Sequence, residues 1–234
     1  MVSFHDLSLD ERRSLVDEGT EHFRRHAANL SKAELNAPSL LDGWSRRQLI
    51  AHLGYNAVGL CRLLDGAAAG EAKPMYASAE AREQEIAKSV DLDDGDLYDL
   101  FDSEAARLDT TWRELPSEAW SVTLKTPQGK AVPTSATLWM RSREVWIHAV
   151  DLGTGATFEA IPPVVQETLL NEVTDGWRGS GMAVAVDGDS SETTIKIDDG
   201  ISARGTVPAL LTWMTGRGSA GVSPPDVPPA PRWL

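Results

Sequence analysis

The chain has 234 residues, 41% of them hydrophobic, and a formal net charge of -13 from 35 acidic and 22 basic side chains. This length suits one large domain or two small ones, and the apolar content is sufficient for a buried core. The acidic charge argues against non-specific binding to nucleic acid and to anionic membrane surfaces. Because Cys61 is the only cysteine, the chain forms no internal disulfide.

The sequence leads us to expect neither a signal peptide nor a membrane span. Its first residues lack the apolar core of a signal peptide, and no apolar run approaches the roughly 18 residues of a spanning helix. Cys61 sits among leucines, so we interpret it as a small buried apolar residue and not as a nucleophile. We therefore expect a cytoplasmic, monomeric protein that acts on small molecules, without nucleic-acid or membrane partners.

The first 153 residues have mostly helical patterns. Three Ser-x-x-Glu/Gln capping boxes, which begin at Ser8, Ser31 and Ser45, each predict the start of a helix. The third box opens a strongly periodic helix with one stripe formed by Leu49, Leu53, Asn56, Leu60 and Leu64. His52 follows Leu49 by three positions, so it is expected to point inward or nearly so.

Turn residues divide the chain after this helix. Residues 66–74 are rich in Ala and Gly and predict a linker, and residues 78–90 predict a helix that carries Arg82. A further helix ends at Pro116, and residues 120–133 predict a hairpin around Thr-Pro-Gln-Gly. Helical periodicity then returns from Pro133 to Val150.

The remainder predicts a smaller α+β unit. Apolar periodicity indicates a helix over residues 162–177, and a last helix over residues 208–215. Between them, three short β-branched runs predict strands at residues 182–186, 193–197 and 201–207.

Two histidines and one carboxylate form a candidate metal site. Glu144 and His148 are four apart, so on a helix their side chains share one face. With His52 on a facing helix, the three could hold a divalent metal and leave one position open. The alternative is a solvated or mutually hydrogen-bonded pair, since an unpaired buried carboxylate is costly. Spacing leaves both interpretations open.

Three further polar residues accompany this set. Asp151 follows His148 by three positions and either accepts its second N–H or simply lies near the helix end. Arg141 precedes Glu144 by three positions and is a candidate ion-pair partner. Asn56, one turn after His52, is either a polar group of the pocket or part of a helix–helix hydrogen bond.

Two arginines have ordinary local interpretations. Arg82 lies among acidic residues, and this composition favours a surface charge on a mixed helix. Arg217 follows a helix end and locally resembles a cation placed near the helix dipole. The glycines form neither a phosphate loop nor a nucleophile elbow.

Three segments together carry a family resemblance. They are Gly43-Trp44-Ser45 with Ala51-His52-Leu53, then Arg141-x-x-Glu144-x-x-x-His148-x-x-Asp151-Leu-Gly, and Trp213-x-x-Gly-Arg217. In this order they resemble the mycothiol-dependent maleylpyruvate isomerases over essentially the whole chain. The resemblance implies an α+β fold, with a DinB-like four-helix bundle in residues 1–155. A small α+β domain with a short antiparallel sheet would follow in residues 156–234.

The resemblance also implies a chemistry. It places a divalent metal, expected to be Zn²⁺, on His52, Glu144 and His148, with mycothiol as the thiol cosubstrate and maleylpyruvate as the substrate. Arg82 matches the position of the family's catalytic arginine, which overrides its local interpretation, and Arg217 becomes a candidate anion contact. The implied reaction is cis–trans isomerisation to fumarylpyruvate in gentisate-type aromatic degradation, by thiolate addition, bond rotation and elimination.

Alternatives remain open on the same scaffold. A different metal-dependent mycothiol S-transferase would add the thiol permanently to an electrophile. A non-enzymatic binding or regulatory module would keep the fold without the reaction. A non-haem iron oxygenase with the same two histidines and carboxylate fits poorly, because nothing in the sequence indicates the β-barrel that such sites commonly occupy.

Overall fold

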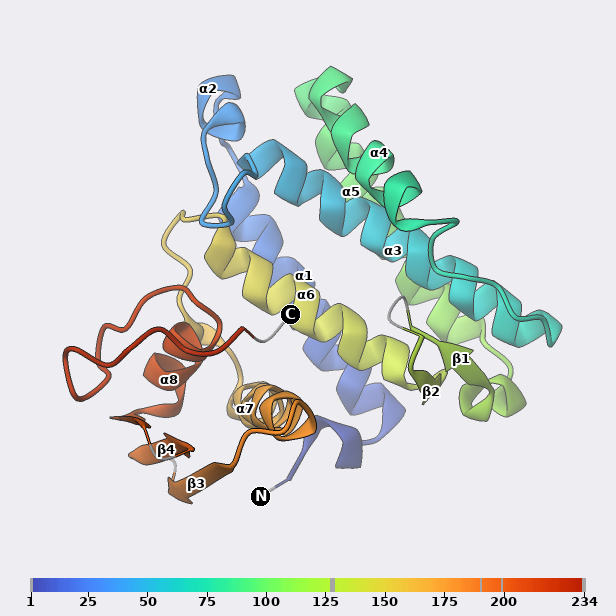
Figure 1. Cartoon of the computed structure of the whole chain (residues 1–234). Helices are drawn as coiled ribbons and strands as arrows, with labels where there is room; N and C mark the ends of the chain where they lie inside the picture. The colour runs from blue at the N-terminus through green and yellow to red at the C-terminus, as the bar shows by residue number, and fades with distance from the viewer. Residues whose placement is uncertain (1, 127–128, 190, 199, 233–234) are drawn as a thin grey trace. The chain divides into compact units, whose positions relative to one another are not determined.

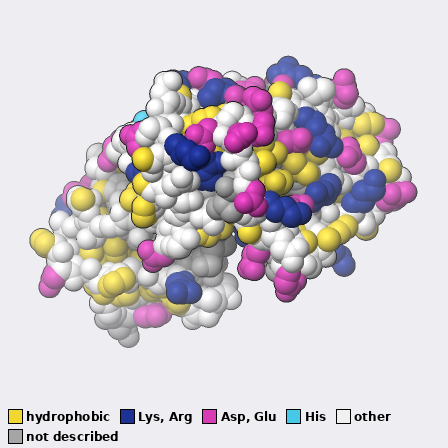
Figure 2. All heavy atoms as spheres, turned by 90° about the horizontal axis from the view of Figure 1, so that it is seen from above, with side chains coloured by type: hydrophobic (Ala, Val, Ile, Leu, Met, Phe, Trp, Pro, Cys, Tyr) yellow, Lys and Arg dark blue, Asp and Glu magenta, His cyan; other side chains and the backbone are white. Residues whose placement is uncertain are grey.

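The computed structural model describes residues 2–126, 129–189, 191–198 and 200–232. The chain divides into two compact units, Ser8–Gly155 and a second formed by Met1–Leu7 with Ala156–Leu234. Among the described residues, no helix has both the length and the apolar character that a membrane crossing requires. Acidic and basic side chains are interspersed over the face shown in Figure 2.

Four long helices build the first unit: α1 (Leu9–Ala27), α3 (Arg46–Ala69), α5 (Asp94–Glu114) and α6 (Ala136–Asp151). In Figure 1, α1 and α6 lie side by side, and α3 packs against both α5 and α6. The contact between α3 and α6 is the one that brings the candidate metal ligands together.

Short elements connect these helices. They are α2 (Lys32–Asn36), α4 (Ala79–Ala87), the 3-10 helices Lys88–Asp91 and Ser117–Ser121, and the strands β1 (Thr123–Lys125) and β2 (Ala131–Pro133). The two strands pair antiparallel, with Leu124 opposite Val132, so the predicted hairpin is confirmed in its strands. Its predicted turn includes residues 127 and 128, which lie outside the described residues.

The three predicted capping boxes are confirmed. Ser8, Ser31 and Ser45 each accept from the backbone three residues on, and each is capped reciprocally. The linker predicted from residue 66 is wrong in its first part, because α3 continues through Ala69. Alanine favours helix, and the helix ends only at Gly70, whose φ of 69° is the left-handed conformation that glycine adopts readily.

A close approach between α1 and α6 fixes the orientation of α6. A Cβ atom at Gly19 would lie 2.7 Å from atoms of both Val145 and Trp146, so only glycine allows this contact. The indole of Trp146 is buried against α1 and donates to the carbonyl of Leu15 at 3.3 Å. Glu144 and His148 each lie two residues from Trp146, so they point to the opposite face of α6, toward α3.

The second unit is the predicted small α+β structure. It contains the 3-10 helices Phe4–Asp6 and Phe158–Ala160, α7 (Pro163–Gly179), β3 (Val184–Gly188), β4 (Thr193–Ile197), β5 (Ile201–Gly205) and α8 (Val207–Met214). The strands form one antiparallel sheet in the order β3-β4-β5. Trp177 of α7 meets Trp213 of α8 edge to face in its core, with 6.2 Å between ring centroids.

The first residues belong to this second unit, whereas the sequence division placed them in the bundle. Phe4 is fully buried, and its backbone N–H donates to the Thr168 hydroxyl on α7 at 2.8 Å. The burial of this aromatic side chain contributes to holding the segment in the second unit. The division into two domains that fold independently stays a prediction.

Candidate metal centre

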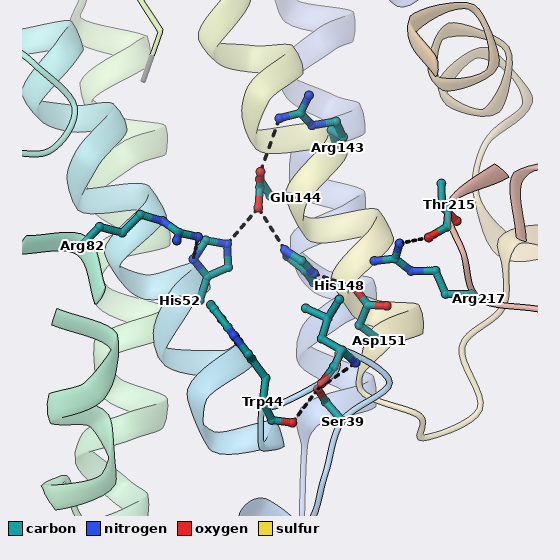
Figure 3. Close-up of polar contacts among 11 residues, drawn as sticks. Ser39, Trp44, His52, Arg82, Arg143, Glu144, His148, Asp151, Thr215 and Arg217 are labelled. Carbon is teal, nitrogen blue, oxygen red and sulfur yellow. Dashed lines mark hydrogen bonds and ion pairs between the residues drawn. The ribbon is translucent and has the colours of Figure 1, made fainter. Parts of the chain in front are cut away.

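His52 from α3 and Glu144 and His148 from α6 converge on one point (Figure 3). The Oε2 atom of Glu144 lies 3.0 Å from Nε2 of His52 and 3.0 Å from Nε2 of His148. One ligand atom from each of the three residues lies within 4.8 Å of the other two. The candidate set predicted from spacing is therefore assembled across the α3–α6 interface.

Mutual hydrogen bonds control the charges of this group. Burial alone would raise the pKa of Glu144, but the hydrogen bonds from His148 and His52 outweigh it and hold that pKa well below its usual range. Burial lowers the pKa of His52. Burial would also lower the pKa of His148, but its bonds to Asp151 and Glu144 raise it to about 9. A metal on Nε2 of His148 must displace a proton below that pH.

Asp151 contacts His148 on the side of the imidazole ring away from Glu144. Its carboxylate is fully buried, and Oδ2 lies 2.8 Å from Nδ1 of His148. This contact leaves Nε2 of His148 free to act as a ligand, because the Nδ1–H donates to the carboxylate. A donor set of two imidazoles and one carboxylate, with a carboxylate behind one imidazole, is typical of zinc sites, so these residues fit the metal that the resemblance implies.

Arg82 reaches the same group from α4. Its Nη2 atom lies 3.4 Å from Nδ1 of His52, on the side of the ring away from Glu144 (Figure 3). The guanidinium carbon lies 6.0 Å from the ring centre of Trp44 and 5.9 Å from that of Tyr76, which are cation–π distances. The local interpretation of Arg82 as a surface charge is therefore wrong in position, since the side chain is half-buried and turned toward the candidate metal ligands.

Comparison with known proteins decides the family. The family model described as the mycothiol maleylpyruvate isomerase N-terminal domain matches residues 16–153, which is more than half of the chain. The chain belongs to the mycothiol maleylpyruvate isomerase family. The resemblance inferred from the sequence motifs is thereby confirmed. No curated protein sequence matches the chain.

Solved structures extend the match to the whole chain. A crystal structure of the mycothiol-dependent maleylpyruvate isomerase is 46% identical with a TM-score of 0.93, and the match covers 100% of both chains. A structure described as the H52A mutant of that enzyme is 45% identical over the same extent, again with a TM-score of 0.93. The α+β fold class is thereby confirmed.

A third solved structure is similar in fold alone. YfiT from Bacillus subtilis, described as a probable metal-dependent hydrolase with an unusual four-helix bundle topology, is 17% identical with a TM-score of 0.51. The match covers 65% of this chain and 89% of that chain.

Three residues that contact the candidate ligands or Arg82 were not predicted as site residues. Trp44 meets His52 edge to face at 5.4 Å, from a loop anchored by the bond from Leu40 N–H to the Asp151 carbonyl. Arg143 lies 3.6 Å from Oε1 of Glu144. Burial raises the pKa of the third residue, Tyr76, to about 12, so its phenol stays protonated beside Arg82.

Arg141 and Asn56 form a hydrogen-bonded contact between α6 and α3. Arg141 donates from Nη1 to the Leu53 carbonyl at 2.7 Å and to Oδ1 of Asn56 at 2.9 Å, both on α3. Among the described residues no direct ion pair joins Arg141 to Glu144, although the Glu144 charge opposes the lowering of the Arg141 pKa by burial. The cation in contact with Glu144 is Arg143. For Asn56, the structure matches the helix–helix hydrogen bond, which ties α6 to α3 one turn from His52.

Two candidates remain, Cys61 and Arg217. The Cys61 thiol is buried, lies 3.8 Å from the Thr111 hydroxyl, and has a pKa raised by burial, as expected of an apolar core residue. Arg217 belongs to the second unit, where its guanidinium donates to the Thr215 carbonyl at the end of α8. This contact agrees with the local interpretation, and a role of Arg217 toward substrate or thiol stays a prediction.

Replacing Asp151 by asparagine should weaken metal binding without unfolding α6. The amide keeps the shape of the side chain but removes the negative charge that faces the Nδ1–H of His148. We expect metal affinity to fall by about 10- to 100-fold, as is usual for such supporting carboxylates. Competition with a chelator measures this loss; an unchanged affinity would show that Asp151 only ends the helix.

Proposed function

We propose that this protein is a metal- and mycothiol-dependent isomerase that converts maleylpyruvate to fumarylpyruvate. The family relation makes the chain an enzyme, and the observation that carries the proposal is the full-length, 46% identical match to the mycothiol-dependent maleylpyruvate isomerase. The assembled group of His52, Glu144 and His148 supports it, because its residue types and spacing suit a catalytic metal.

We propose zinc as the metal on these three side chains. Two imidazole nitrogens and one carboxylate oxygen are ligands that zinc accepts, and three protein ligands leave one position for a reactant. When bound, the metal would supply a Lewis acid that lowers the pKa of a thiol ligand.

The thiol solves a specific chemical problem. The carbon–carbon double bond of the substrate does not rotate, but addition of a thiolate converts it to a single bond that does. Expulsion of the thiolate after rotation gives the trans product and regenerates the thiol. A free thiol has a pKa of about 8.5, so only a small part is thiolate at neutral pH. A site that lowers the pKa of the thiol would therefore raise the fraction of reactive thiolate at neutral pH.

Arg82 is the residue that we assign to the substrate. Addition of the thiolate moves negative charge onto the substrate carbonyl oxygen as an enolate. A guanidinium beside His52 is placed to stabilise that charge or to hold a substrate carboxylate. The rings of Trp44 and Tyr76 on either side limit the positions that Arg82 can adopt.

The deciding experiment follows maleylpyruvate with metal-loaded protein in the presence and absence of mycothiol. Thiol-dependent formation of fumarylpyruvate, with mycothiol recovered unchanged, is the expected result. A stable conjugate of mycothiol with the substrate would instead identify an S-transferase. No thiol-dependent rate together with absence of stoichiometric metal would favour a binding or regulatory module.

A further inference from the structure

A pocket of about 510 Å³ adjoins Arg82 within the first unit. Its walls come from the segment between α3 and α4, from Arg82 itself and from the β1–β2 hairpin. Its lining includes the side chains of Lys73, Met75, Tyr76, Arg82, Leu124 and Lys125. Its volume lies within the range of sites that bind small molecules.

The charge of this pocket is opposite to that of the chain. The described lining residues include Lys73, Arg82 and Lys125 but no aspartate or glutamate, although the chain has a net charge of -13. Lys73 lies 3.7 Å from Glu71, but this ion pair is exposed and therefore weak. A lining with cations alone selects for an anion.

Arg82 connects the pocket to the candidate metal centre. It lines the pocket, and its Nη2 atom lies 3.4 Å from Nδ1 of His52. A ligand in the pocket would therefore lie beside Arg82, in a lining that also contains the two lysines. The lining also contains Met75 and Leu124, which are buried, and Tyr76, which is half-buried, so the cations adjoin an apolar wall. This arrangement suits an elongated molecule with a polar anionic end.

We infer that this pocket holds the carboxylate end of the substrate that is remote from the reacting double bond, with Lys73 and Lys125 as specificity-determining residues. The inference rests on the proposed function. Maleylpyruvate carries a carboxylate at each end of an uncharged diketone chain, which matches cations around an apolar wall. Mycothiol carries no carboxylate, so the lysines favour the substrate over the thiol.

The test removes both charges and keeps the apolar stems, in the double variant Lys73→Met/Lys125→Met. We expect KM for maleylpyruvate to rise by about tenfold, as for loss of charge-assisted hydrogen bonds, while kcat, KM for mycothiol and metal content stay near wild type. Lys130→Met is the matched control, because Lys130 is exposed on the same hairpin and lies outside the lining. An unchanged KM for maleylpyruvate in the double variant would overturn the inference.

A binding measurement separates this inference from the proposed function. The probe is the saturated analogue of maleylpyruvate, in which a single bond replaces the double bond, titrated calorimetrically into metal-loaded protein. We expect the double variant to bind this analogue about tenfold more weakly than wild type does. The uncharged dimethyl ester of the analogue should bind weakly, and with the same affinity, to both proteins. Lysine-dependent binding without isomerisation would refute only the proposed function. Isomerisation with lysine-independent binding would refute only the subsite.

Discussion

Replacing His52 by alanine is expected to abolish metal binding and isomerase activity together. Among the described residues, His52 is the one candidate ligand on α3, so the substitution leaves only Glu144 and His148 of the set, on one face of α6. Loss of a residue that merely supports a ligand typically costs 10- to 100-fold in metal affinity, so loss of a ligand should cost more than about 100-fold. Metal content after dialysis and thiol-dependent turnover measure the two effects on one sample.

A second histidine variant controls for the loss of a histidine as such. His5 is exposed and lies outside the candidate site, so His5→Ala should keep both metal and activity. Circular dichroism should show that His52→Ala keeps its helices, because α3 is held independently by the bonds from Arg141 to Leu53 and Asn56. Full turnover in a His52→Ala protein that retains no metal would exclude the metal from the reaction.

The three candidate ligands could be picked out from the sequence because their signals are local, although spacing left a hydrogen-bonded group as the alternative to a metal site. Two ligands share a helix face at a spacing of four residues, and the third lies near the start of a helix marked by the Ser45 capping box. Helical periodicity alone places each inward. The pairing of α3 with α6 is a long-range step that no local pattern encodes, because the connections between the long helices are long and contain elements of their own.

Residues that reach the site from loops or from a mixed helix could not be predicted in this way. Trp44 and Tyr76 precede α3 and α4, where no periodicity indicates which way a side chain points. Arg82 lies among glutamates, so local composition favours solvent, whereas the rings of Trp44 and Tyr76 hold it at the site. Phe4 joins the second unit by a contact with Thr168, more than 160 positions away, that no local pattern encodes.

The two candidate ligand histidines differ in the group that contacts their Nδ1 atom. His148 has the buried carboxylate of Asp151 as an acceptor for its Nδ1–H, whereas His52 has the guanidinium of Arg82, which contains donors only. In the form of His52 that ligates through Nε2, Nδ1 carries its own hydrogen and accepts none. Arg82 then cannot donate a hydrogen bond to Nδ1 of His52, so its Nη2 donor is available to a substrate anion.

Replacing Arg82 by alanine should therefore retain metal and fold but lower kcat by about 100- to 1,000-fold, which is the usual cost of removing a donor to a developing oxyanion. Arg82→Lys should recover only part of the rate, because lysine keeps the charge but not the planar fork of donors. Arg107→Ala, on the exposed face of α5, controls for loss of an arginine as such.

The division between kcat and KM identifies what Arg82 does. A lowered kcat with nearly unchanged KM would place its main interaction on the enolate, which exists only after thiolate addition. A raised KM with nearly unchanged kcat would place it on a substrate carboxylate and make it the near end of the cationic pocket that Lys73 and Lys125 continue. If the variant keeps the wild-type kcat and KM, Arg82 has no role in the reaction. Its guanidinium, 3.4 Å from His52, would then contribute only to local packing.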